Sequence, residues 1–170
     1  MVVERVRIRP FQSSDQAGVE WLYSRTPPWG RTYPRPQSIP ESLTHIQDSH
    51  RLALVAVEQD RAGEAVVGLT TVIDAGPDNE IAVPGFIRLE GRVARLHLVL
   101  VAPERWRHGI GTRMVDKAIA WSREHGYEAV IVDTTSDQKG AVEFYRAMNF
   151  AESGRTTFRD WEIVWFELKL

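Results

Sequence analysis

The sequence predicts an α/β fold: a mixed, mostly antiparallel sheet with a central parallel strand–helix–strand unit and helices on both faces. Two observations favour this class. The strongest apolar run, residues 93–101, is followed by an amphipathic segment at 112–125 and a second apolar run at 129–132. Consecutive strand, helix and strand form a right-handed crossover, which makes the two strands parallel. The other strands can pair antiparallel.

The first part of the chain predicts one strand and two helices. Residues 6–9 alternate apolar and charged side chains, as a short strand does. Asp15, after two serines, is a candidate cap for a helix that buries Val19, Leu22 and Tyr23. Five prolines and a glycine then predict a long loop over residues 27–40, a length typical of functional loops. Residues 41–49 can form a short second helix.

The middle of the chain predicts a hairpin and then the central strand. Strands are expected at residues 52–58 and 65–73, with a turn between them. Residues 75–90 contain two glycines and two prolines, which predicts an extended connection. The strand at 93–101 is closed by Pro103.

The last part of the chain predicts two helices and a β-rich end. The helix at 112–125 places one face toward the core, with Gly126 at its C-terminal cap; that face holds Met114, Val115, Ala118, Ile119 and Ser122. Helical spacing recurs at Ala141, Val142, Phe144, Tyr145 and Met148. Strands are expected at residues 156–158 and 162–168.

The amino-acid composition argues against several classes of protein. The 170 residues fit one domain, 1–170, and 43% of them are hydrophobic. A formal charge of −2 argues against a protein that coats nucleic acid or an anionic membrane. Without cysteine there is no disulfide, thiolate zinc site or cysteine nucleophile, and the histidines lack metal-ligand spacing. The N-terminal residues do not resemble a signal peptide, so a cytoplasmic protein is expected.

A glycine-containing loop between the central strand and its helix predicts an anion site. Gly109 and Gly111 let the backbone turn tightly just before the helix, whose first N–H groups lack internal partners. Such groups, at the positive end of the helix dipole, bind phosphate or pyrophosphate. Basic side chains of the same loop can neutralise the remaining charge: Arg105, Arg107 and His108.

The region from about residue 96 to 150 resembles the GCN5-related N-acetyltransferase (GNAT) family. That family has Gln/Arg-x-x-Gly-x-Gly/Ala after a strand ending in apolar-x-Pro, and later Ala-x-x-Phe-Tyr-x-x-x-Gly-Phe. The later pattern is matched here by Ala141, Phe144, Tyr145, Asn149 and Phe150. Trp106 replaces the Gln/Arg, and Asn149 replaces a glycine, which predicts a left-handed asparagine.

The resemblance implies an acetyl-CoA-dependent N-acetyltransferase, in which a primary amine attacks the thioester directly in a ternary complex. Acetyl-CoA is the cofactor it implies, with the thioester oxygen held by main-chain N–H groups near the end of the central strand. The cofactor-binding residues implied are Val99, Leu100, Val101, Trp106, Arg107, His108, Gly109, Ile110, Gly111, Thr112, Gln138 and Phe144. Gln138 stands where relatives often have asparagine.

Two side chains are candidate catalytic residues. Tyr145 looks like the family tyrosine that protonates the departing thiolate; the structural alternative is an aromatic ring packed in the core. His97 interrupts an otherwise apolar strand, and some relatives carry an acidic base at the matching position. A hydrogen-bonded core histidine is the equal alternative for His97, and other acids could serve as the base: Asp74, Glu90 or Asp133.

Two other function classes stay open at this point: a non-enzymatic acetyl-CoA-binding or regulatory module, and a nucleic-acid-binding domain. Tyr145 favours an enzyme, Trp106 slightly favours the module, and the neutral charge disfavours nucleic acid. The expected partners are a small-molecule or peptide amine, with no nucleic acid and no membrane; a homodimer is open. An aromatic wall could line the acceptor pocket, formed by Trp21, Trp29, Tyr33 and Phe86.

Overall fold

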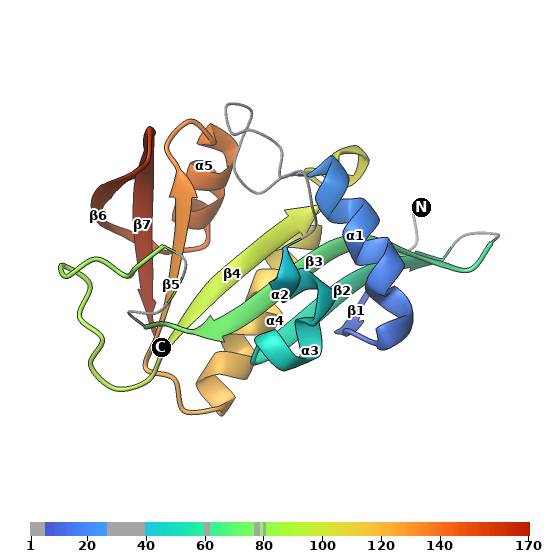
Figure 1. Cartoon of the computed structure of the whole chain (residues 1–170), viewed down its shortest axis with the longest axis horizontal. Coiled ribbons are helices and arrows are strands. Elements are labelled where there is room, and N and C mark those ends of the chain that lie inside the picture. The colour runs from blue at the N-terminus through green and yellow to red at the C-terminus, as the bar shows by residue number, and fades with distance from the viewer. Residues whose placement is uncertain (1–5, 27–39, 60–61, 77–78, 80) are drawn as a thin grey trace. The chain divides into compact units, whose positions relative to one another are not determined.

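The computed structural model describes residues 6–26, 40–59, 62–76, 79 and 81–170, and these fall into two compact units (Figure 1). Unit 1 holds the described residues of 6–26, 40–59, 62–72 and 97–118. Unit 2 holds those of 73–76, 79, 81–96 and 119–170. Strand β4 (Val93–Val101) and helix α4 (Ile110–Glu124) contribute residues to both units. The expectation of one domain over the whole chain stays a prediction.

The strands form the mixed sheet that the sequence predicts. Seven strands follow the order β1-β2-β3-β4-β5-β7-β6. β4 pairs in parallel with β5 (Ala129–Thr135), from Val93 opposite Ala129 to Arg95 opposite Ile131. The pairs β1–β2, β2–β3, β5–β7 and β6–β7 are antiparallel. The predicted fold class is confirmed.

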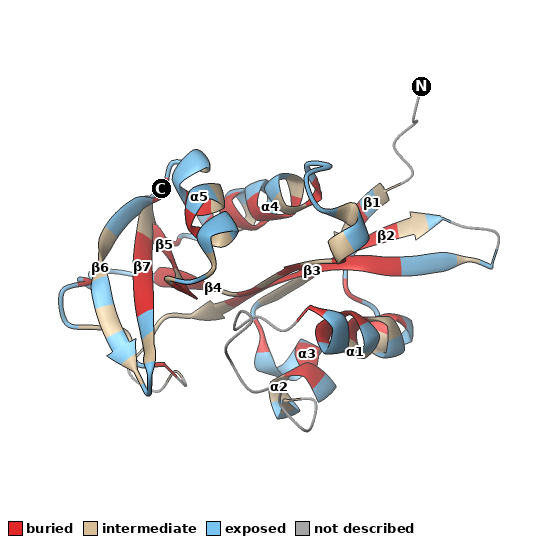
Figure 2. Cartoon of the chain, turned by 90° about the horizontal axis from the view of Figure 1, so that it is seen from above, coloured by how far each residue is buried: buried red, intermediate tan, exposed pale blue. Residues whose placement is uncertain are grey.

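Unit 1 has helices on both faces of its strands. Helices α1 to α3 cover one face of β1–β3, and α4 covers the other (Figures 1 and 2). The core between them includes Leu22, Leu43, Leu69 and Met114, all without solvent exposure. The element bounds are β1 Val6–Pro10, α1 Gln16–Arg25, α2 Glu41–Thr44, α3 Ile46–Ser49, β2 Leu52–Gln59 and β3 Glu64–Asp74.

At the start of unit 1, Asp15 accepts hydrogen bonds from the residues that precede α1. Its carboxylate accepts the backbone N–H of Gln12 at 2.8 Å and two hydrogen bonds from the Arg9 guanidinium, at 2.7 and 2.8 Å. Burial alone would raise the pKa of Asp15, but these hydrogen bonds hold it below its ordinary value. Asp15 stands at the N-cap position of α1 but makes no side-chain capping hydrogen bond to it; its carboxylate instead caps the preceding 3₁₀ turn, Ser13–Asp15, so the side-chain cap expected on α1 is wrong. α1 begins directly after it and buries Val19, Leu22 and Tyr23 as expected.

Unit 2 contains helix α5 (Lys139–Ala147) and strands β5, β6 (Ala151–Phe158) and β7 (Trp161–Lys169), and α5 contacts β7 through the Tyr145 and Phe166 rings. Its core is built around Trp165, Ile131 and Ile163, which are at most 1% exposed. Asn149 ends α5 with φ 65°, so the predicted left-handed asparagine is confirmed. Gly126 likewise ends α4 with φ 74°.

Several predicted boundaries differ from the structure. α4 begins at Ile110, two residues before the expected start, because buried Ile110 already belongs to its core-facing side. The single helix expected at 41–49 is split at His45, whose φ of −132° and ψ of 50° are not helical. β6 begins at Ala151 rather than residue 156, since its exposed polar side chains hide the strand pattern. Most of the proline-rich segment, 27–39, lies outside the described residues. No helix in the described part of the chain is long and apolar enough to cross a membrane.

Candidate functional site

The glycine-containing loop follows β4 and is anchored inside unit 1. A short 3₁₀ turn, Pro103–Arg105, opens it. Arg105 donates two hydrogen bonds to one Glu58 carboxylate oxygen on β2, at 2.9 and 2.7 Å, and Glu104 pairs with Arg25 of α1 at 2.8 Å. The charge of Arg105 is therefore already paired, and its expected role in neutralising a bound anion stays a prediction.

The backbone of this loop turns through two left-handed residues. Arg107 has φ 63° and Gly109 has φ 74°, while Gly111 is not among the residues with positive φ and is the second residue of α4. A β-carbon added to Gly109 would meet no atom within 4 Å. The space over this residue is therefore open, as the close approach of a ligand to the backbone requires.

The N-terminus of α4 presents several N–H groups. The first regular helical bond is donated by Arg113 to the Gly109 carbonyl, at 3.0 Å. Within the described residues no hydrogen bond is made by the backbone N–H groups of 107–112. Alternating left- and right-handed residues and a free helix N-terminus both concentrate N–H groups into an anion-binding surface. This arrangement fits a pyrophosphate.

The side chains of the glycine-containing loop differ in whether they contact nearby backbone or solvent. The Trp106 indole N–H donates to the Val101 carbonyl at 2.7 Å, and its ring is 58% exposed. His108 Nδ1 lies 2.8 Å from the Trp106 carbonyl, so this nitrogen carries the proton. Arg107 is exposed and, among the described residues, makes no ion pair. Arg107 is thus the cation of this loop that remains for a ligand, with the His108 ring beside it.

β4 presents a second group of candidate residues in unit 1. Leu98 and Leu100 point into the core, whereas His97, Val99 and Val101 alternate with them and are only partly buried. His97 Nδ1 lies 2.9 Å from Nε2 of His50, which follows α3. His50 is 9% exposed, and burial lowers its pKa below the ordinary histidine value. His97 therefore has a histidine partner that sequence reasoning missed.

Tyr145 is buried in unit 2 among three aromatic rings. Its ring centroid lies 5.3 Å from that of Phe144 and 5.8 Å from those of Phe150 and Phe166. Burial raises the pKa of Tyr145, and the Asp133 carboxylate raises it further, so the phenol is protonated at neutral pH. No group in the described part of the chain hydrogen-bonds its hydroxyl. The hydroxyl oxygen is also not among the buried polar atoms of the described residues that lack a partner, so it reaches solvent and is accessible to a ligand atom.

The other candidates of unit 2 are held by local contacts. Gln138 precedes α5 and donates from Nε2 to the Thr135 hydroxyl at 3.1 Å, and Phe144 stacks edge-on against Tyr145. Ile110, Gly111 and Thr112 form the first turn of α4 in unit 1. The structure thus places the candidates in two groups, one in each unit.

The alternative bases have partners of their own. Asp133 pairs with Arg95 at 2.6 Å, with both side chains nearly buried. Asp74 accepts the Tyr127 hydroxyl at 2.6 Å. Glu90 lies on the surface beside Arg88, 3.8 Å away. Among the ionisable residues considered for proton transfer, Asp133 and Glu90 lie beside arginines, whereas His97 contacts the His50 ring and Asp74 contacts the Tyr127 hydroxyl.

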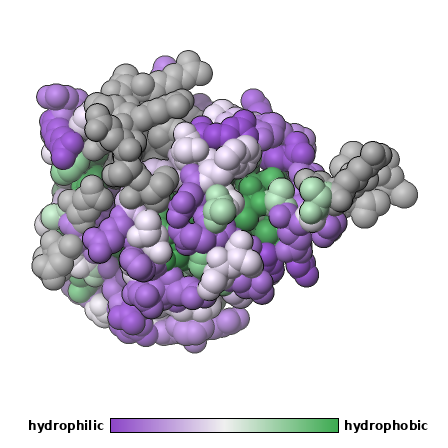
Figure 3. All heavy atoms as spheres, turned by 45° about the vertical axis from the view of Figure 1, so that its right-hand side comes forward, coloured by the Kyte–Doolittle hydropathy of each residue, from purple (hydrophilic) through white to green (hydrophobic). Residues whose placement is uncertain are grey.

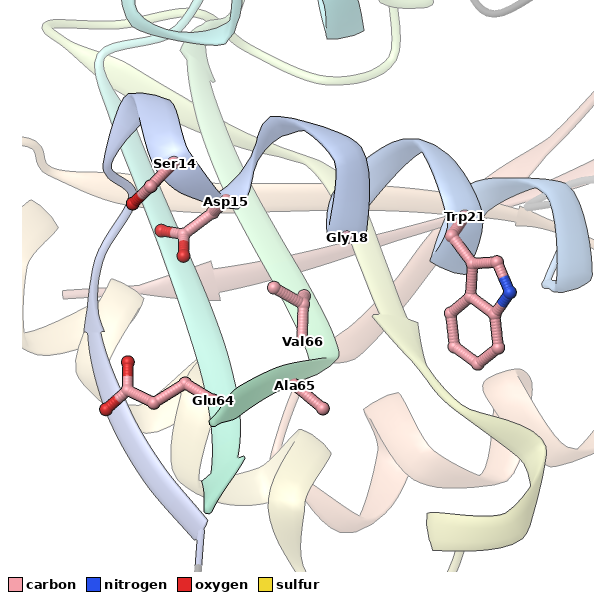
Figure 4. A pocket seen from close by; sticks show the side chains of 7 residues that line it. All are labelled: Ser14, Asp15, Gly18, Trp21, Glu64, Ala65 and Val66. Atoms are coloured by element: carbon pink, nitrogen blue, oxygen red, sulfur yellow. The ribbon is translucent and has the colours of Figure 1, made fainter. Parts of the chain in front are cut away.

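A pocket of about 290 Å³ lies under α1, at the edge of β3 (Figure 4). Its lining residues are Ser14, Asp15, Gly18, Trp21, Glu64, Ala65 and Val66. Its two carboxylates pair with Arg9, and none of the candidate catalytic or cofactor-binding residues contributes to it. Hydrophilic side chains cover most of the face in Figure 3, with a small hydrophobic area between them.

The expected aromatic wall is described only in part. Trp21 is 51% exposed and lines the pocket under α1, so it is not packed in the core. Phe86 is 47% exposed and lies in unit 2 over Gly154, where an added β-carbon would come within 2.8 Å of its ring. Trp29 and Tyr33 lie outside the described residues.

Comparison with known proteins gives partial sequence matches and full-length structural ones. The chain is 37% identical over 60 residues to an uncharacterised N-acetyltransferase of Methanocaldococcus jannaschii, a match that covers 35% of this chain and 26% of that protein. It is 35% identical over 72 residues to human N-acetyltransferase 8, covering 42% and 31%. The matched region thus spans about a quarter to a third of these relatives.

The fold is similar to that of Arabidopsis thaliana NAA60 in complex with acetyl-CoA. The TM-score is 0.76 at 16% identity, and the match covers 97% of this chain and 98% of the other. A family model described as the acetyltransferase (GNAT) family matches residues 17–150, most of the chain and both units. By this match, the protein is a member of the acetyltransferase (GNAT) family.

Proposed function

We propose that the protein transfers an acetyl group from acetyl-CoA to a primary amine, with both units serving one catalytic domain. The observation that carries the proposal is the loop 106–112, with its left-handed residues and unpaired N–H groups, in a chain of the GNAT family. The acetyl-CoA complex of the Arabidopsis relative supports the choice of ligand.

The residues of the loop fit the diphosphate of coenzyme A. The N–H groups of Gly109–Thr112 would bind the phosphate oxygens, while Arg107 and His108 would neutralise their charge. The open space over Gly109 would let the phosphates reach the backbone. Backbone N–H groups of Val99–Val101 would hold the thioester oxygen, with Gln138 and Phe144 as further contacts in unit 2.

When bound, acetyl-CoA would supply the acetyl group as a thioester with a thiolate leaving group. Residues of the chain would then carry out two proton transfers. His97 would accept a proton from the ammonium form of the acceptor, which leaves a lone pair on the attacking nitrogen. Tyr145 would donate a proton to the sulfur. The acceptor would be a small-molecule or peptide amine.

The first test combines binding and chemistry. Acetyl-CoA at about 100 times its Kd should stabilise the folded protein by about 2.7 kcal/mol, seen as a rise in Tm, whereas short nucleic acids should not. A panel of small amines and peptides should then show release of free thiol above the rate without protein. Binding without thiol release from any amine would favour a non-enzymatic acetyl-CoA-binding module. The observation that supports this alternative is Trp106, which replaces the Gln/Arg of the family and donates its indole N–H to the Val101 carbonyl. No binding would contradict the proposal.

Replacing His97 by glutamine should lower kcat/KM about 100-fold, within the range for general base catalysis, without changing the Kd for acetyl-CoA. The rate of the wild-type protein should rise with pH, because a base must lose its own proton before it can accept one. The glutamine variant should lack this rise. His125→Gln, at an exposed histidine of unit 2, is the control. An unchanged pH profile in His97→Gln would make His97 structural.

A further inference from the structure

The contact between His50 and His97 joins two rings from distant parts of the sequence. Their ring centroids lie 5.1 Å apart with an interplanar angle of 29°, and the nitrogens that face each other are His50 Nε2 and His97 Nδ1, 2.9 Å apart. His50 follows α3 and is buried, while His97 is partly exposed on β4. One of the two facing nitrogens must carry the proton between them.

The far side of the His50 ring decides which nitrogen that is. His50 Nδ1 lies 3.2 Å from the carbonyl oxygen of Ile46, and a carbonyl can only accept, so Nδ1 carries the proton. Burial disfavours the charged ring and lowers the pKa of His50, so the ring is neutral and holds one proton. Nε2 of His50 is then an acceptor. His97 must donate to it from Nδ1, and its own unprotonated nitrogen is Nε2.

We propose that His50 is a positioning residue, which holds His97 in the tautomer with its proton on Nδ1, so that Nε2 receives the proton of the acceptor amine. This inference rests on the proposed function. In the step, one N–H bond of the ammonium group breaks and its electron pair stays on the amine nitrogen. A new N–H bond forms at His97 Nε2, and the positive charge passes to the His97 ring.

The charged side chains nearest to the pair on β4 and beside His50 are exposed or already paired. β3, which neighbours β4 in the sheet, has no charged residue between Ala65 and Ile73. On the segment that carries His50, the nearest charged side chains, Asp48 and Arg51, are exposed. Further along β4, Arg95 is paired with Asp133. The hydrogen bond between His97 Nδ1 and His50 Nε2, with His50 Nδ1 on the Ile46 carbonyl, is therefore the contact from which the His97 tautomer is inferred.

Nitrogen NMR of the full chain labelled with ¹⁵N-histidine tests the tautomer without any substrate. Two-bond ¹⁵N–¹H couplings distinguish a protonated from an unprotonated ring nitrogen, and His97→Gln identifies the His97 signals by removing them. In the wild-type protein, above the pH where histidine titrates, Nδ1 of both rings should carry the proton. A proton on Nε2 of His97 would overturn the inference, whatever the activity.

Two substitutions of His50 then separate tautomer control from packing. His50→Phe keeps a ring of similar size but removes the acceptor, so His97 should become a mixture of tautomers. With an active amine, kcat should fall by roughly 10-fold, and the rise of rate with pH should shift, at an unchanged Kd for acetyl-CoA. His50→Gln supplies an acceptor oxygen and should restore both the tautomer and most of the rate. His45→Phe, at an exposed histidine between α2 and α3, is the matched control.

The outcomes separate this inference from the proposed function. A wild-type rate and pH profile in folded His50→Phe would overturn the positioning role, even if the protein is an acetyltransferase. The same loss of rate in His50→Gln and His50→Phe, with the His97 tautomer unchanged in both, would also overturn it, because packing would then be the cause. If no amine is acetylated, the proposed function fails, and the NMR arm still decides whether His50 sets the tautomer.

Discussion

Replacing Gly109 by valine should raise the Kd for acetyl-CoA by roughly 100-fold or more, while the protein remains folded. Gly109 has φ 74°, which a β-branched residue rarely adopts, so the variant must change the loop backbone or place its side chain in the open space above it. Either change disturbs hydrogen bonds from N–H groups to phosphate. Losing two such bonds to a charged group costs about 3 kcal/mol, which corresponds to roughly 100-fold in Kd.

Gly126→Val is the matched control for this experiment. Gly126 also has φ 74°, an added β-carbon there also meets no atom within 4 Å, and it lies beyond the other end of α4. Both variants should lose about 1–3 kcal/mol of stability from backbone strain. Only Gly109→Val should weaken binding, as measured by calorimetry. Wild-type affinity in folded Gly109→Val would remove the basis for placing the phosphates at this loop.

The helices and strands that the sequence predicts accurately are those whose pattern of apolar side chains can be recognised within the element itself. The apolar run of β4 and the amphipathic face of α4 were placed to within two residues, because burial repeats at the period of each element. Gly126 was assigned to a helix cap from its place after the amphipathic segment, and Asn149 to a left-handed position because it replaces a glycine of the family pattern. β6 was predicted five residues too short, since a strand with exposed polar side chains has no apolar alternation to detect.

The candidate site was predictable in its residues but not in their partners. The loop 106–112 follows from glycines and from family resemblance, whereas the pairing of Arg105 with Glu58 joins residues 47 positions apart. The same separation divides His50 from His97. No local pattern encodes such pairs, because strand register and helix packing bring them together. A buried-strand histidine such as His97 signals that a partner is needed without saying which one.

Tyr145 shows that the packing and functional interpretations of a residue can hold together. Its ring has three aromatic neighbours, as the core alternative predicts, while its hydroxyl has no hydrogen-bond partner among the described residues. The ring can therefore fix the direction of a hydroxyl that remains available to a ligand. Burial also raises the pKa of Tyr145, which keeps the proton on oxygen until it is needed.

Replacing Tyr145 by phenylalanine should lower kcat by about 10- to 1000-fold, the range expected for loss of a general acid, with a nearly unchanged Kd for acetyl-CoA. The ring contacts persist and the hydroxyl has no protein partner to lose, so Tm should change little. Because the pKa of Tyr145 is raised above the ordinary tyrosine value, the wild-type rate should not fall with pH below about 10 through ionisation of this group.

Tyr127→Phe provides the comparison that makes this result specific. Tyr127 is also a buried tyrosine of unit 2, but its hydroxyl donates to Asp74 at 2.6 Å. Its removal should lower stability by roughly 1–3 kcal/mol, because the Asp74 carboxylate loses a donor, and should leave kcat unchanged. The two variants therefore exchange their effects: Tyr145→Phe loses rate and keeps stability, and Tyr127→Phe does the reverse. Equal turnover in wild type and Tyr145→Phe would assign Tyr145 to packing alone and leave sulfur protonation to the His97 imidazolium or to water.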